Sequence, residues 1–511
     1  MSLMRQKAEE LRQKKAQAMQ MGGEAAVQRQ HAEGKLTARE RIDLLFDPGS
    51  FVEFGALAEH EPRNPQMAGK HTPADGVITG YGSVSGQPVA CAAYDFTVMA
   101  GSMGEVGERK VARMRELALR LRIPIVWLLD SSGARIQESA GSQFAGSGDL
   151  FFEQVIMSGV VPQVAAVMGP CAAGTAYIPA LADVAFMVKG TSSMALGGPH
   201  LVKAAVGEEI SAEELGGSRI HCTISGCADL EAESDAACIQ AVKEYLGYLT
   251  QPLLASADPP DRPVDSLLDL VPAEPNKVYD MRKVIAAIVD DGRSFELKAG
   301  WGRSIITTLA RLGGRSVGIL ASQPSFRGGV LDVDSADKAA RFITLCDAYD
   351  VPLVFLVDVP GFLIGSKVEQ QGIIRHGAKM LYAVSEATVP KMTVVLRKAY
   401  GAGYFVMCGR TYETDQILAW PTAEISVMGP EGAAAIIFRK EIDSADDPAA
   451  VRAERVAMLR QLINPYVAAA GAHVDDVIDP AQTRALLIRG LQMAQGKRVE
   501  RPRRKHGIFP V

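Results

Sequence analysis

Two stretches of the chain follow the same pattern. Residues 122–135 read RIPIVWLLDSSGAR and residues 350–365 read DVPLVFLVDVPGFLIG, so each has a proline, a short apolar run, an aspartate and a turn that contains glycine. Three pairs of landmark residues are each separated by 228 positions: Pro124 and Pro352, Asp130 and Asp358, and Pro162 and Pro390. A repeat this long indicates two copies of a whole domain rather than a solenoid of short units.

Strands alternate with helices in both copies. In the first copy, the spacing of apolar residues predicts a hairpin over 75–97, a helix over 104–122, a strand that ends at Asp130, a helix near 149–159 and a helix at about 177–183. In the second copy it predicts a hairpin that turns at Gly313-Gly314 and helices over 335–349 and 370–386. This alternation is typical of an α/β or layered ββα fold with parallel pairing.

A proline-rich stretch separates the two copies. The 511 residues are too many for one hydrophobic core, and six prolines fall within the polar stretch 252–275. The sequence therefore predicts an N-terminal domain over 1–255, a linker over 256–275 and a C-terminal domain over 276–511. The first 45 residues are charged and helical in pattern, which indicates a solvated helix with one packed stripe, or alternatively an arm that docks on another subunit.

Composition and charge argue against several classes of function. A net charge of −5 disfavours nucleic acid as the main partner. The seven cysteines include no Cys-x-x-Cys pair and the eight histidines are scattered, so we expect reduced thiols, no metal site and a cytoplasmic location. No uncharged run reaches the roughly 18 residues of a membrane helix, and the N-terminus lacks the apolar segment of a signal peptide.

Three short stretches resemble known functional motifs in sequence, but their predicted secondary structure or position argues against those functions. Gly314–Gly318 matches the hydrolase pattern G-x-S-x-G, yet a strand-to-strand turn precedes it, so Ser316 is expected within a strand. Lys379, in Ala-Lys-Met, half-resembles a biotin attachment site but lies in a helical run, as a surface lysine would. The basic tail 498–506 is expected to be solvated, with a contact to CoA phosphate or another subunit as the alternative. Neither G-x-G-x-x-G nor G-x-x-x-x-G-K-[ST] occurs, so no nucleotide site is predicted.

The remaining candidate site is made of backbone. Each copy has two turns of small residues, and all four follow apolar strands: Gly133-Ala134 and Ala173-Gly174 in the first copy, Gly361-Phe362 and Ala402-Gly403 in the second. One such turn alone is most often only a turn, but small residues at four equivalent places let peptide N–H groups point into a cleft. Paired N–H donors stabilise an enolate or another oxyanion, so the four turns predict two oxyanion holes. The pattern places no acid, base or nucleophile, and the amides beside Ser131 and Ser132 are expected to act in place of the hydroxyls.

A series of ordered motifs makes the chain similar to a known family. The motifs are GKLTARERIDLLFDPGSFVEFG, DGVITGYGSVSG, DSSGARIQE, GPCAAGTAYIPALAD, EELGG, VDVPGF, KAYGAGY and SVMGPEGAA. Together they resemble the β (carboxyltransferase) subunit of biotin-dependent acyl-CoA carboxylases, and the likeness runs from about residue 5 to the C-terminal RKHGIFPV. That family includes the β subunits of propionyl-CoA and 3-methylcrotonyl-CoA carboxylases and related decarboxylases.

The resemblance implies a fold, an assembly and a reaction. The fold would be two tandem crotonase-like ββα-spiral domains, and the assembly a ring-shaped homohexamer within an α6β6 holoenzyme. The two turns of the first copy would bind the thioester oxygen of acyl-CoA, and those of the second the ureido oxygen of carboxybiotin. Tyr177, Tyr404 and Phe405 would be substrate-binding residues.

In the implied reaction, carboxybiotin releases CO2, biotin takes the α-proton of the acyl-CoA, and the thioester enolate attacks CO2. The carboxyl group would reach the α- or γ-carbon of a short or branched acyl-CoA. Biotin would be carried by a partner α subunit with biotin carboxylase and carrier domains, because this chain has neither motif. No metal or nucleotide is expected on this chain, and neither nucleic acid nor a membrane is expected as a partner.

Two positions depart from the family pattern. Ala173 stands where Gly-Gly is common, and a backbone N–H survives an alanine. Phe405 follows Tyr404 where propionyl-type members often have Asp, which favours an acyl-CoA other than propionyl-CoA. The nearest alternative function is the carboxyltransferase subunit of a biotin-dependent decarboxylase. A non-catalytic scaffold of such a complex and a stand-alone crotonase-type hydratase or isomerase are alternatives of other classes that fit these motifs less well.

Overall fold

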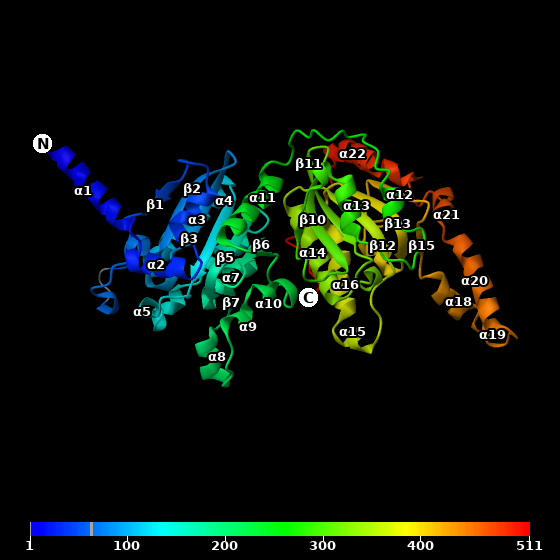
Figure 1. Cartoon of the computed structure of the whole chain (residues 1–511), viewed down its shortest axis with the longest axis horizontal. Helices are drawn as coiled ribbons and strands as arrows, with labels where there is room; N and C mark the ends of the chain where they lie inside the picture. The colour runs from blue at the N-terminus through cyan, green and yellow to red at the C-terminus, as the bar shows by residue number, and fades with distance from the viewer. Residues whose placement is uncertain (1, 62–64) are drawn as a thin grey trace. The chain divides into compact units, whose positions relative to one another are not determined.

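The chain divides into two compact units, residues 1–250 and 251–511. The structure is a computed structural model and describes residues 2–61 and 65–511. Each unit has a mixed sheet covered by helices (Figure 1). The predicted α/β class and the duplication are confirmed, because the two sheets have the same strand order.

The first unit is built on an eight-stranded sheet of order β1-β2-β3-β4-β5-β6-β8, with β7 paired to β5. The strands are β1 (Val52–Phe54), β2 (Val77–Val84), β3 (Gln87–Tyr94), β4 (Ile125–Ser131), β5 (Gln163–Ala172), β6 (Val184–Val188), β7 (Ser193–Ala195) and β8 (Leu230–Ala232). The helices are α1 (Leu3–Ala18), α2 (Glu24–Ala32), α3 (Ala38–Leu45), α4 (Glu105–Leu121), α5 (Ile136–Ser139), α6 (Asp149–Met157), α7 (Tyr177–Leu181), α8 (Pro199–Val206), α9 (Ala212–Gly216), α10 (Ser218–Thr223) and α11 (Asp235–Thr250). β2 and β3 form the predicted hairpin, and the strands from β3 to β6 run parallel.

The second unit repeats this plan with the order β16-β14-β13-β12-β11-β10-β9 and with β15 paired to β13. The strands are β9 (Ser294–Leu297), β10 (Ile305–Leu312), β11 (Arg315–Ser322), β12 (Leu353–Val359), β13 (Lys391–Tyr400), β14 (Gln416–Ala419), β15 (Glu424–Ser426) and β16 (Asp476–Val477). The helices are α12 (Leu267–Leu270), α13 (Met281–Ile288), α14 (Val333–Ala348), α15 (Ser366–Gln370), α16 (Ile373–Glu386), α17 (Ala402–Val406), α18 (Pro430–Ile437), α19 (Arg439–Asp443), α20 (Pro448–Leu462), α21 (Pro465–Ala470) and α22 (Thr483–Met493). β12 and β13 begin and end 228 positions after β4 and β5, so the sequence repeat is also a repeat of strands.

The elements form where the apolar pattern predicts them. Every residue of β4 and of β12 is buried, as expected for central parallel strands that are covered on both faces. α4 buries a stripe that includes Val111, Met114 and Ala118, and it ends at Arg122 in the left-handed conformation, two residues before Pro124. The five helices predicted within the two copies all exist, with ends within three residues of those predicted.

The pairing of the two central strands contains a bulge in each unit. Leu129 of β4 pairs with Val167 of β5, but two residues later Ser131 pairs with Cys171, so β5 has two extra residues at this point. In the second unit, Val357 pairs with Val395 and Val359 with Ala399, which is the same slip 228 positions later. A bulge bends its strand and redirects the chain that follows. In both units the bulged strand leads directly into a glycine-containing turn.

The start of the predicted linker and the residues just before it are packed against the second unit. Leu254 N–H donates to Gly314 O at 2.9 Å, and Arg484 donates to the carbonyl oxygens of Asp258 and Pro259, both at 3.3 Å. Gly314 has no room for a side chain, because a Cβ would lie 1.9 Å from Leu254 O. The prolines therefore follow the surface of the second unit.

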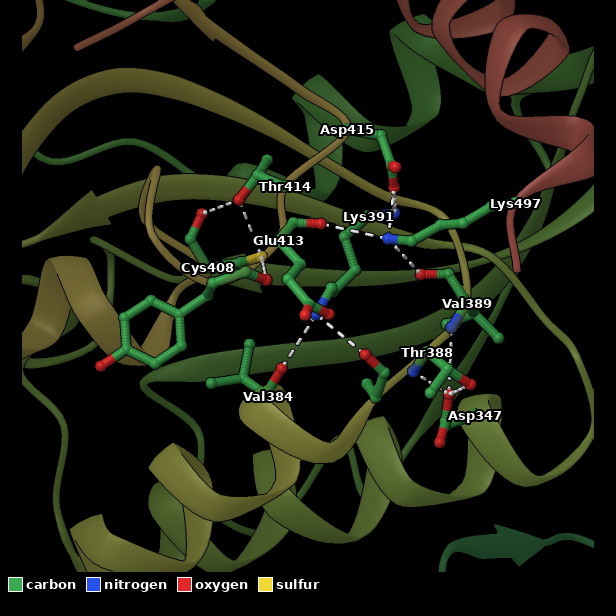
Figure 2. A network of polar contacts seen from close by, with 12 residues as sticks. Asp347, Val384, Thr388, Val389, Lys391, Cys408, Glu413, Thr414, Asp415 and Lys497 are labelled. Carbon is green, nitrogen blue, oxygen red and sulfur yellow. Dashed lines mark hydrogen bonds and ion pairs between the residues drawn. The ribbon is translucent and has the colours of Figure 1, made fainter. Parts of the chain in front are cut away.

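Charged side chains in and just before the C-terminal tail contact carboxylates of the second unit, and Figure 2 shows the contacts of Lys497. Lys497 Nζ lies 2.8 Å from Asp415 Oδ2 and 3.1 Å from Glu413 O, and Arg501 pairs with Glu413 at 2.7 Å. Arg504 pairs with a glutamate of α16. Residues 502–506 are exposed, as expected for a solvated tail, whereas Arg501 is half-buried and pairs with a carboxylate far away in the sequence.

A buried lysine, Lys391, belongs to the same network, since its backbone N–H and Lys497 Nζ share the Oδ2 atom of Asp415 (Figure 2). Lys391 is fully buried and donates to Val384 O at 3.1 Å and Ala387 O at 2.9 Å, at the end of α16. These carbonyl groups lie at the C-terminal end of the helix, where no N–H group of the helix can donate to them. Burial lowers the pKa of Lys391. The side chain therefore caps α16.

The structure shows where two of the motif-like stretches lie, those that contain Ser316 and Lys379. Ser316 lies in β11 and pairs with Arg311 of β10, so the predicted strand position is confirmed. Lys379 lies in α16 as predicted, but its side chain is only 18% exposed and pairs with Asp337 at 3.1 Å. The expectation of a free surface lysine is therefore wrong.

Within residues 2–61 and 65–511, no group of His, Cys, Asp and Glu side chains could hold a metal ion. In the same residues, no helix is long and apolar enough to span a membrane.

The cysteines give a first testable prediction. All seven are free thiols, and all except Cys227 are buried. We expect iodoacetamide to modify one cysteine in the native protein and all seven in denaturant, as counted by intact mass. A Cys227→Ser variant should take up none in the native state. Rapid native modification at a second cysteine would contradict this burial pattern.

Candidate active site

The first turn of the first unit begins where β4 ends. Gly133 has a φ of +100°, which glycine adopts without steric cost. Ala134 then forms a parallel bridge with Met103, in which Met103 N–H donates to Gly133 O and Arg135 N–H donates to Met103 O, both at 2.9 Å. Because successive peptide groups of an extended chain point to opposite sides, the Ala134 N–H points away from this bridge.

One of the two predicted donors of this turn is already engaged. Gly133 N–H donates to Ser131 Oγ at 3.2 Å, and Ser131 is fully buried. Within residues 2–61 and 65–511, no hydrogen bond engages the Ala134 N–H. Ala134 is therefore the residue of this pair that offers a donor, and the hydroxyl of Ser131 supports the turn.

The second turn of the first unit touches the first. It follows β5, and Ala173 has a φ of +55°, a conformation uncommon for a residue with a side chain. A Cβ on Gly133 would lie 2.9 Å from Ala172 O and 3.3 Å from Ala173 Cβ. A side chain at position 133 would therefore push the turns apart. The close approach brings Ala134 and the Ala173-Gly174 turn to the same end of the sheet.

The second unit has the same construction after β12. Gly361 has a φ of +124°, and Phe362 forms a parallel bridge with Leu331. Leu331 N–H donates to Gly361 O at 3.0 Å, and Leu363 N–H donates to Leu331 O at 2.8 Å. The Phe362 N–H is therefore oriented like that of Ala134. The following turn is again close, since a Cβ on Gly403 would lie 3.1 Å from Gly361 Cα.

The backbone conformation defines which residues of the second turns are equivalent. Gly401 has a φ of +56°, which matches the +55° of Ala173, and the two residues are 228 positions apart. The structural equivalents of Ala173-Gly174 are therefore Gly401-Ala402, one residue before the predicted pair Ala402-Gly403. Gly403 instead lies inside α17 and packs against the first turn. The sequence offset of 228 was the signal that could have identified Gly401.

The three predicted substrate-binding residues follow the second turns. Tyr177 begins α7, is 47% exposed and meets Phe151 edge to face, with 5.6 Å between ring centroids. Tyr404 Oη accepts a hydrogen bond from Arg410 N–H at 3.1 Å. Phe405 is 44% exposed and its ring centroid lies 5.8 Å from that of Tyr404. Each unit thus presents an accessible aromatic ring directly after its pair of turns.

Arg135, which was not predicted as a site residue, directly follows the first turn and holds it in place through buried side-chain contacts. Its side chain is buried, and Nη1 lies 2.5 Å from Asp75 Oδ1 and 3.0 Å from Glu138 Oε1. Nη2 donates to Ser102 O at 3.0 Å, and Gly107 N–H donates to Asp75 Oδ2 at 2.6 Å. A buried ion pair with these hydrogen bonds holds the residue after Ala134 in one place. Sequence offers no signal for Asp75, which lies 60 positions earlier.

Lys110 supports the same corner. Its Nζ donates to Ala74 O at 2.7 Å and to Val77 O at 2.6 Å, on either side of Asp75. Ala74 and Asp75 both have positive φ values, of 51° and 49°, so the segment needs such support. Burial lowers the pKa of Lys110 to about 8.

This lowered pKa predicts a pH dependence of stability. The ordinary lysine pKa is about 10.4, so between about pH 8 and 10 the unfolded chain binds more protons than the native chain, and stability rises with pH. In urea unfolding, we expect the wild-type protein to gain stability over a Lys110→Met variant as the pH rises through this range. A Lys189→Met variant, which changes an exposed lysine of the same unit, should show no such divergence. Parallel pH profiles for wild type and Lys110→Met would contradict the assignment.

Two ionisable groups beside the first unit's turns, Cys171 and Arg135, are engaged by other parts of the fold. Cys171 Sγ donates to Thr175 O at 3.1 Å, and burial raises the pKa of this thiol to about 12. Arg135 is paired with Asp75. The chemistry that this geometry supports is the stabilisation of negative charge by peptide N–H groups.

A comparison with protein families identifies the family of this chain. Residues 29–509 match the carboxyl transferase domain family, which covers most of the chain. The chain belongs to the carboxyl transferase family. The family expectation from the sequence motifs is thereby confirmed, and the protein is an enzyme subunit of this family.

Curated relatives align over nearly the whole chain. The methylmalonyl-CoA carboxyltransferase 12S subunit of Propionibacterium freudenreichii subsp. shermanii is 50% identical over 100% of this chain and 98% of its own length. The methylmalonyl-CoA decarboxylase subunit alpha of Veillonella parvula is 46% identical over 100% of both chains. The mitochondrial propionyl-CoA carboxylase beta chain of Homo sapiens is 43% identical over 98% of this chain and 93% of its own.

A solved structure shares the fold throughout. The crystal structure of transcarboxylase 12S, described as a hexamer with methylmalonyl-coenzyme A and methylmalonic acid bound, superposes with a TM-score of 0.96. It is 49% identical and covers 100% of this chain and 99% of that chain. The expected tandem crotonase-like fold is confirmed by this match.

Proposed function

We propose that this chain is the carboxyltransferase subunit that moves a carboxyl group between biotin on a partner protein and a short acyl-CoA. The first unit binds the acyl-CoA, and the second unit binds biotin. Ala134 with Ala173-Gly174, and Phe362 with Gly401-Ala402, supply the backbone donors of two oxyanion holes.

One observation carries this proposal: the same pair of touching turns occurs twice. Gly133 and Gly361 have equivalent positive φ values, and each precedes a residue whose N–H faces away from a parallel bridge. Carboxyl transfer between two carbonyl compounds produces two enolate-like anions, so two holes match the reaction better than one. A hydratase or isomerase needs one hole and a positioned acid or base.

The second unit's turns fit the cyclic urea of biotin. At Gly361 a Cβ would have its closest neighbour 3.8 Å away, so there is space beside this turn, whereas at Gly401 a Cβ would be crowded by Val427 O at 3.0 Å. Biotin, when bound, supplies the carboxyl group and a urea oxygen that gains negative charge as this group leaves. Peptide N–H donors are suited to that oxygen.

In this proposal, the residues of this chain bind the substrates and stabilise the developing negative charge with fixed peptide dipoles. The N–H groups of Ala134 and Gly174 hold the thioester oxygen as charge develops on it. The buried contacts of Arg135 keep the first turn from relaxing when that charge appears, which is how preorganised donors lower a barrier. The exposed rings of Tyr177 and Phe405 cover part of the substrates and exclude water.

The relatives support a three-carbon acyl group. Those at 50% and 43% identity are named for methylmalonyl-CoA and propionyl-CoA, respectively. We therefore propose propionyl-CoA and methylmalonyl-CoA as the substrate pair, in place of the expectation that Phe405 selects another acyl group. The carboxylase, transcarboxylase and decarboxylase directions use the same donors, because a reaction and its reverse share one transition state. The decarboxylase relative keeps that alternative open as a second candidate.

Partners and compartment complete the proposal. The hexamer named for the transcarboxylase 12S structure supports a homohexameric core for this chain. A partner with biotin carboxylase and carrier domains would supply carboxylated biotin, and all seven free cysteines agree with a reducing cytoplasm.

The test is reconstitution with a panel of acyl-CoA thioesters. The purified chain should transfer a carboxyl group from methylmalonyl-CoA to free biotin, and it should carboxylate propionyl-CoA with ATP and bicarbonate only after a biotin-carrying partner is added. Turnover with 3-methylcrotonyl-CoA above that with propionyl-CoA would restore the expectation drawn from Phe405. A chain that assembles with its partner but transfers nothing would indicate a scaffold.

A further inference from the structure

The repeated aspartates lie at the two strand bulges. Asp130 lies in β4 between the residues where the register slips, and Asp358 occupies the same place in β12. Both side chains are fully buried. A buried carboxylate is costly unless cations or hydrogen-bond donors compensate it. A buried aspartate occurs at both of the bulges that precede the active-site turns, which indicates that the aspartate has a structural function there.

Each carboxylate fills the hollow of its bulge. In the first unit the bulged strand has Gly169 at this point, where a Cβ would lie 1.9 Å from Asp130 Oδ1. In the second unit the backbone N–H of Lys398, in the bulge of β13, donates to Asp358 Oδ1 at 3.3 Å. The carboxylates thus occupy the space that the extra residues create.

In the first unit, the compensating groups come from the N-terminal segment. Gln30 Nε2 and Arg41 Nη1 lie 2.8 and 3.1 Å from Asp130 Oδ2, and Lys35 Nζ lies 3.6 Å from Oδ1. All three side chains are buried. They belong to α2, α3 and the loop between them, which we call the N-terminal anchor (residues 24–45).

Arg41 connects the anchor to three parts of the unit. Besides Asp130, its Nε donates to Asp235 Oδ2 of α11 at 2.7 Å, and its Nη2 donates to Met168 O in the bulge of β5 at 3.3 Å. One guanidinium therefore contacts β4, the bulge of β5 and a covering helix. Loss of this side chain would leave two buried carboxylates without their main cation.

In the second unit, the bulged strand supplies its own cations. Arg397 stands 228 positions after Gly169, and its Nε donates to Asp358 Oδ2 at 2.8 Å. Lys398 Nζ adds a contact at 3.2 Å to Oδ1. The two units thus compensate the same aspartate by different routes, one from a distant segment and one from the strand itself.

We propose that Asp130 and Asp358 are positioning residues that hold the strand bulges in register so that the two turns of each unit meet, and that the N-terminal anchor is the positioning element of the acyl-CoA side. The effect of each aspartate is confined to its own unit. Which substrate each unit handles rests on the proposed function, whereas the positioning itself does not.

Hydrogen exchange tests the positioning without any substrate. In Asp130→Asn, which keeps the side-chain shape and removes the charge, we expect amides of peptides covering 129–136 and 170–177 to exchange about tenfold faster. Peptides covering 357–364 and 398–405 should stay at the wild-type rate, and Asp358→Asn should give the opposite pattern. Unchanged exchange at the turns in both variants, or an equal increase in both units, would overturn the proposal.

The anchor has its own matched pair of variants. Arg41→Met should accelerate exchange at the same first-unit peptides, whereas Arg39→Met on the same helix should not, because Arg39 pairs with Glu53 instead. Arg41→Lys should restore part of the protection. Faster exchange throughout the first unit in Arg41→Met, with no excess at the two turns, would reduce Arg41 to a general stabilising residue and overturn its positioning role.

Kinetics then connects positioning to the reaction. In carboxyl transfer from methylmalonyl-CoA to free biotin, both variants should lower kcat, because the turns act on developing charge; Asp130→Asn should also raise the KM for the CoA substrate and leave that for biotin within about twofold, and Asp358→Asn should do the reverse. A wild-type chain without transfer would reject the proposed function, while the exchange data would still decide the positioning role. Exchange as expected with the two KM effects interchanged would retain positioning and overturn the assignment of substrates to units.

Discussion

A Gly401→Val variant is expected to lose at least about 100-fold in the rate of carboxyl transfer, because loss of one oxyanion donor typically costs this much. Gly401 has a φ of +56°, which a β-branched residue does not tolerate, and a Cβ would lie 3.0 Å from Val427 O. The turn would have to change its backbone conformation and with it the direction of the Ala402 N–H. The measurement is transfer from methylmalonyl-CoA to free biotin by the assembled protein.

Two further variants make this result specific. Gly401→Ala should retain much more activity, because the equivalent residue of the first unit is Ala173 with almost the same φ. Gly496→Ala serves as the control in the same unit, since nothing lies within 4 Å of its Cβ position. Activity of Gly401→Val above half of the wild-type rate, in a protein of normal melting temperature, would remove this turn from the active site.

The second large effect concerns stability and centres on Arg484. This side chain is fully buried, and it lies 2.7 Å from Asp290 Oδ1 and donates to Ile288 O at 2.7 Å. Asp290 in turn accepts hydrogen bonds from the N–H groups of Gly313 and Gly314, at 3.0 and 2.6 Å. Arg484→Met would leave a buried carboxylate without its cation, so we expect it to lower the free energy of unfolding of the second unit by about 3–5 kcal/mol.

Urea unfolding combined with hydrogen exchange measures this loss and locates it. Peptides of the second unit should lose protection, while those of the first unit keep theirs. Arg439→Met, which removes an exposed arginine of the same unit, should change stability by no more than about 0.5 kcal/mol. A similar small change in Arg484→Met would mean that the buried pair adds little to stability.

Much of the fold could be predicted because the decisive signals are local. The apolar runs before Asp130 and Asp358, each opened by a proline, specify buried parallel strands without any knowledge of their partners. The strand position of Ser316 follows in the same way from the glycine pair before it. Spacing also identified the four turns, because small residues after apolar strands are a local pattern.

The features that could not be predicted from the sequence are the orientation of peptide N–H groups and contacts between residues far apart along the chain. Residue type alone does not tell which peptide N–H of Gly401-Ala402-Gly403 is available as a donor, since that depends on φ, and only the offset of 228 from Ala173 marks Gly401. The partners of Arg135 and Arg41 lie 60 and 89 positions away, and only the folded chain brings them together. The ion pair of Arg501 in the tail is not visible in the sequence for the same reason, because its carboxylate partner lies 88 positions earlier.

The packing of α22 into the core of the second unit has a consequence for folding during translation. Leu487, Ile488 and Leu491 of α22 belong to the same buried cluster as residues of β10, β12 and β13. The first unit is complete once residue 250 has left the ribosome, and domains commonly fold in this order during translation. The second unit lacks part of its core until α22 has been made. We therefore expect that a premature stop codon shortly before α22 leaves a nascent chain with a folded first half and a second half that remains a substrate for chaperones and proteases.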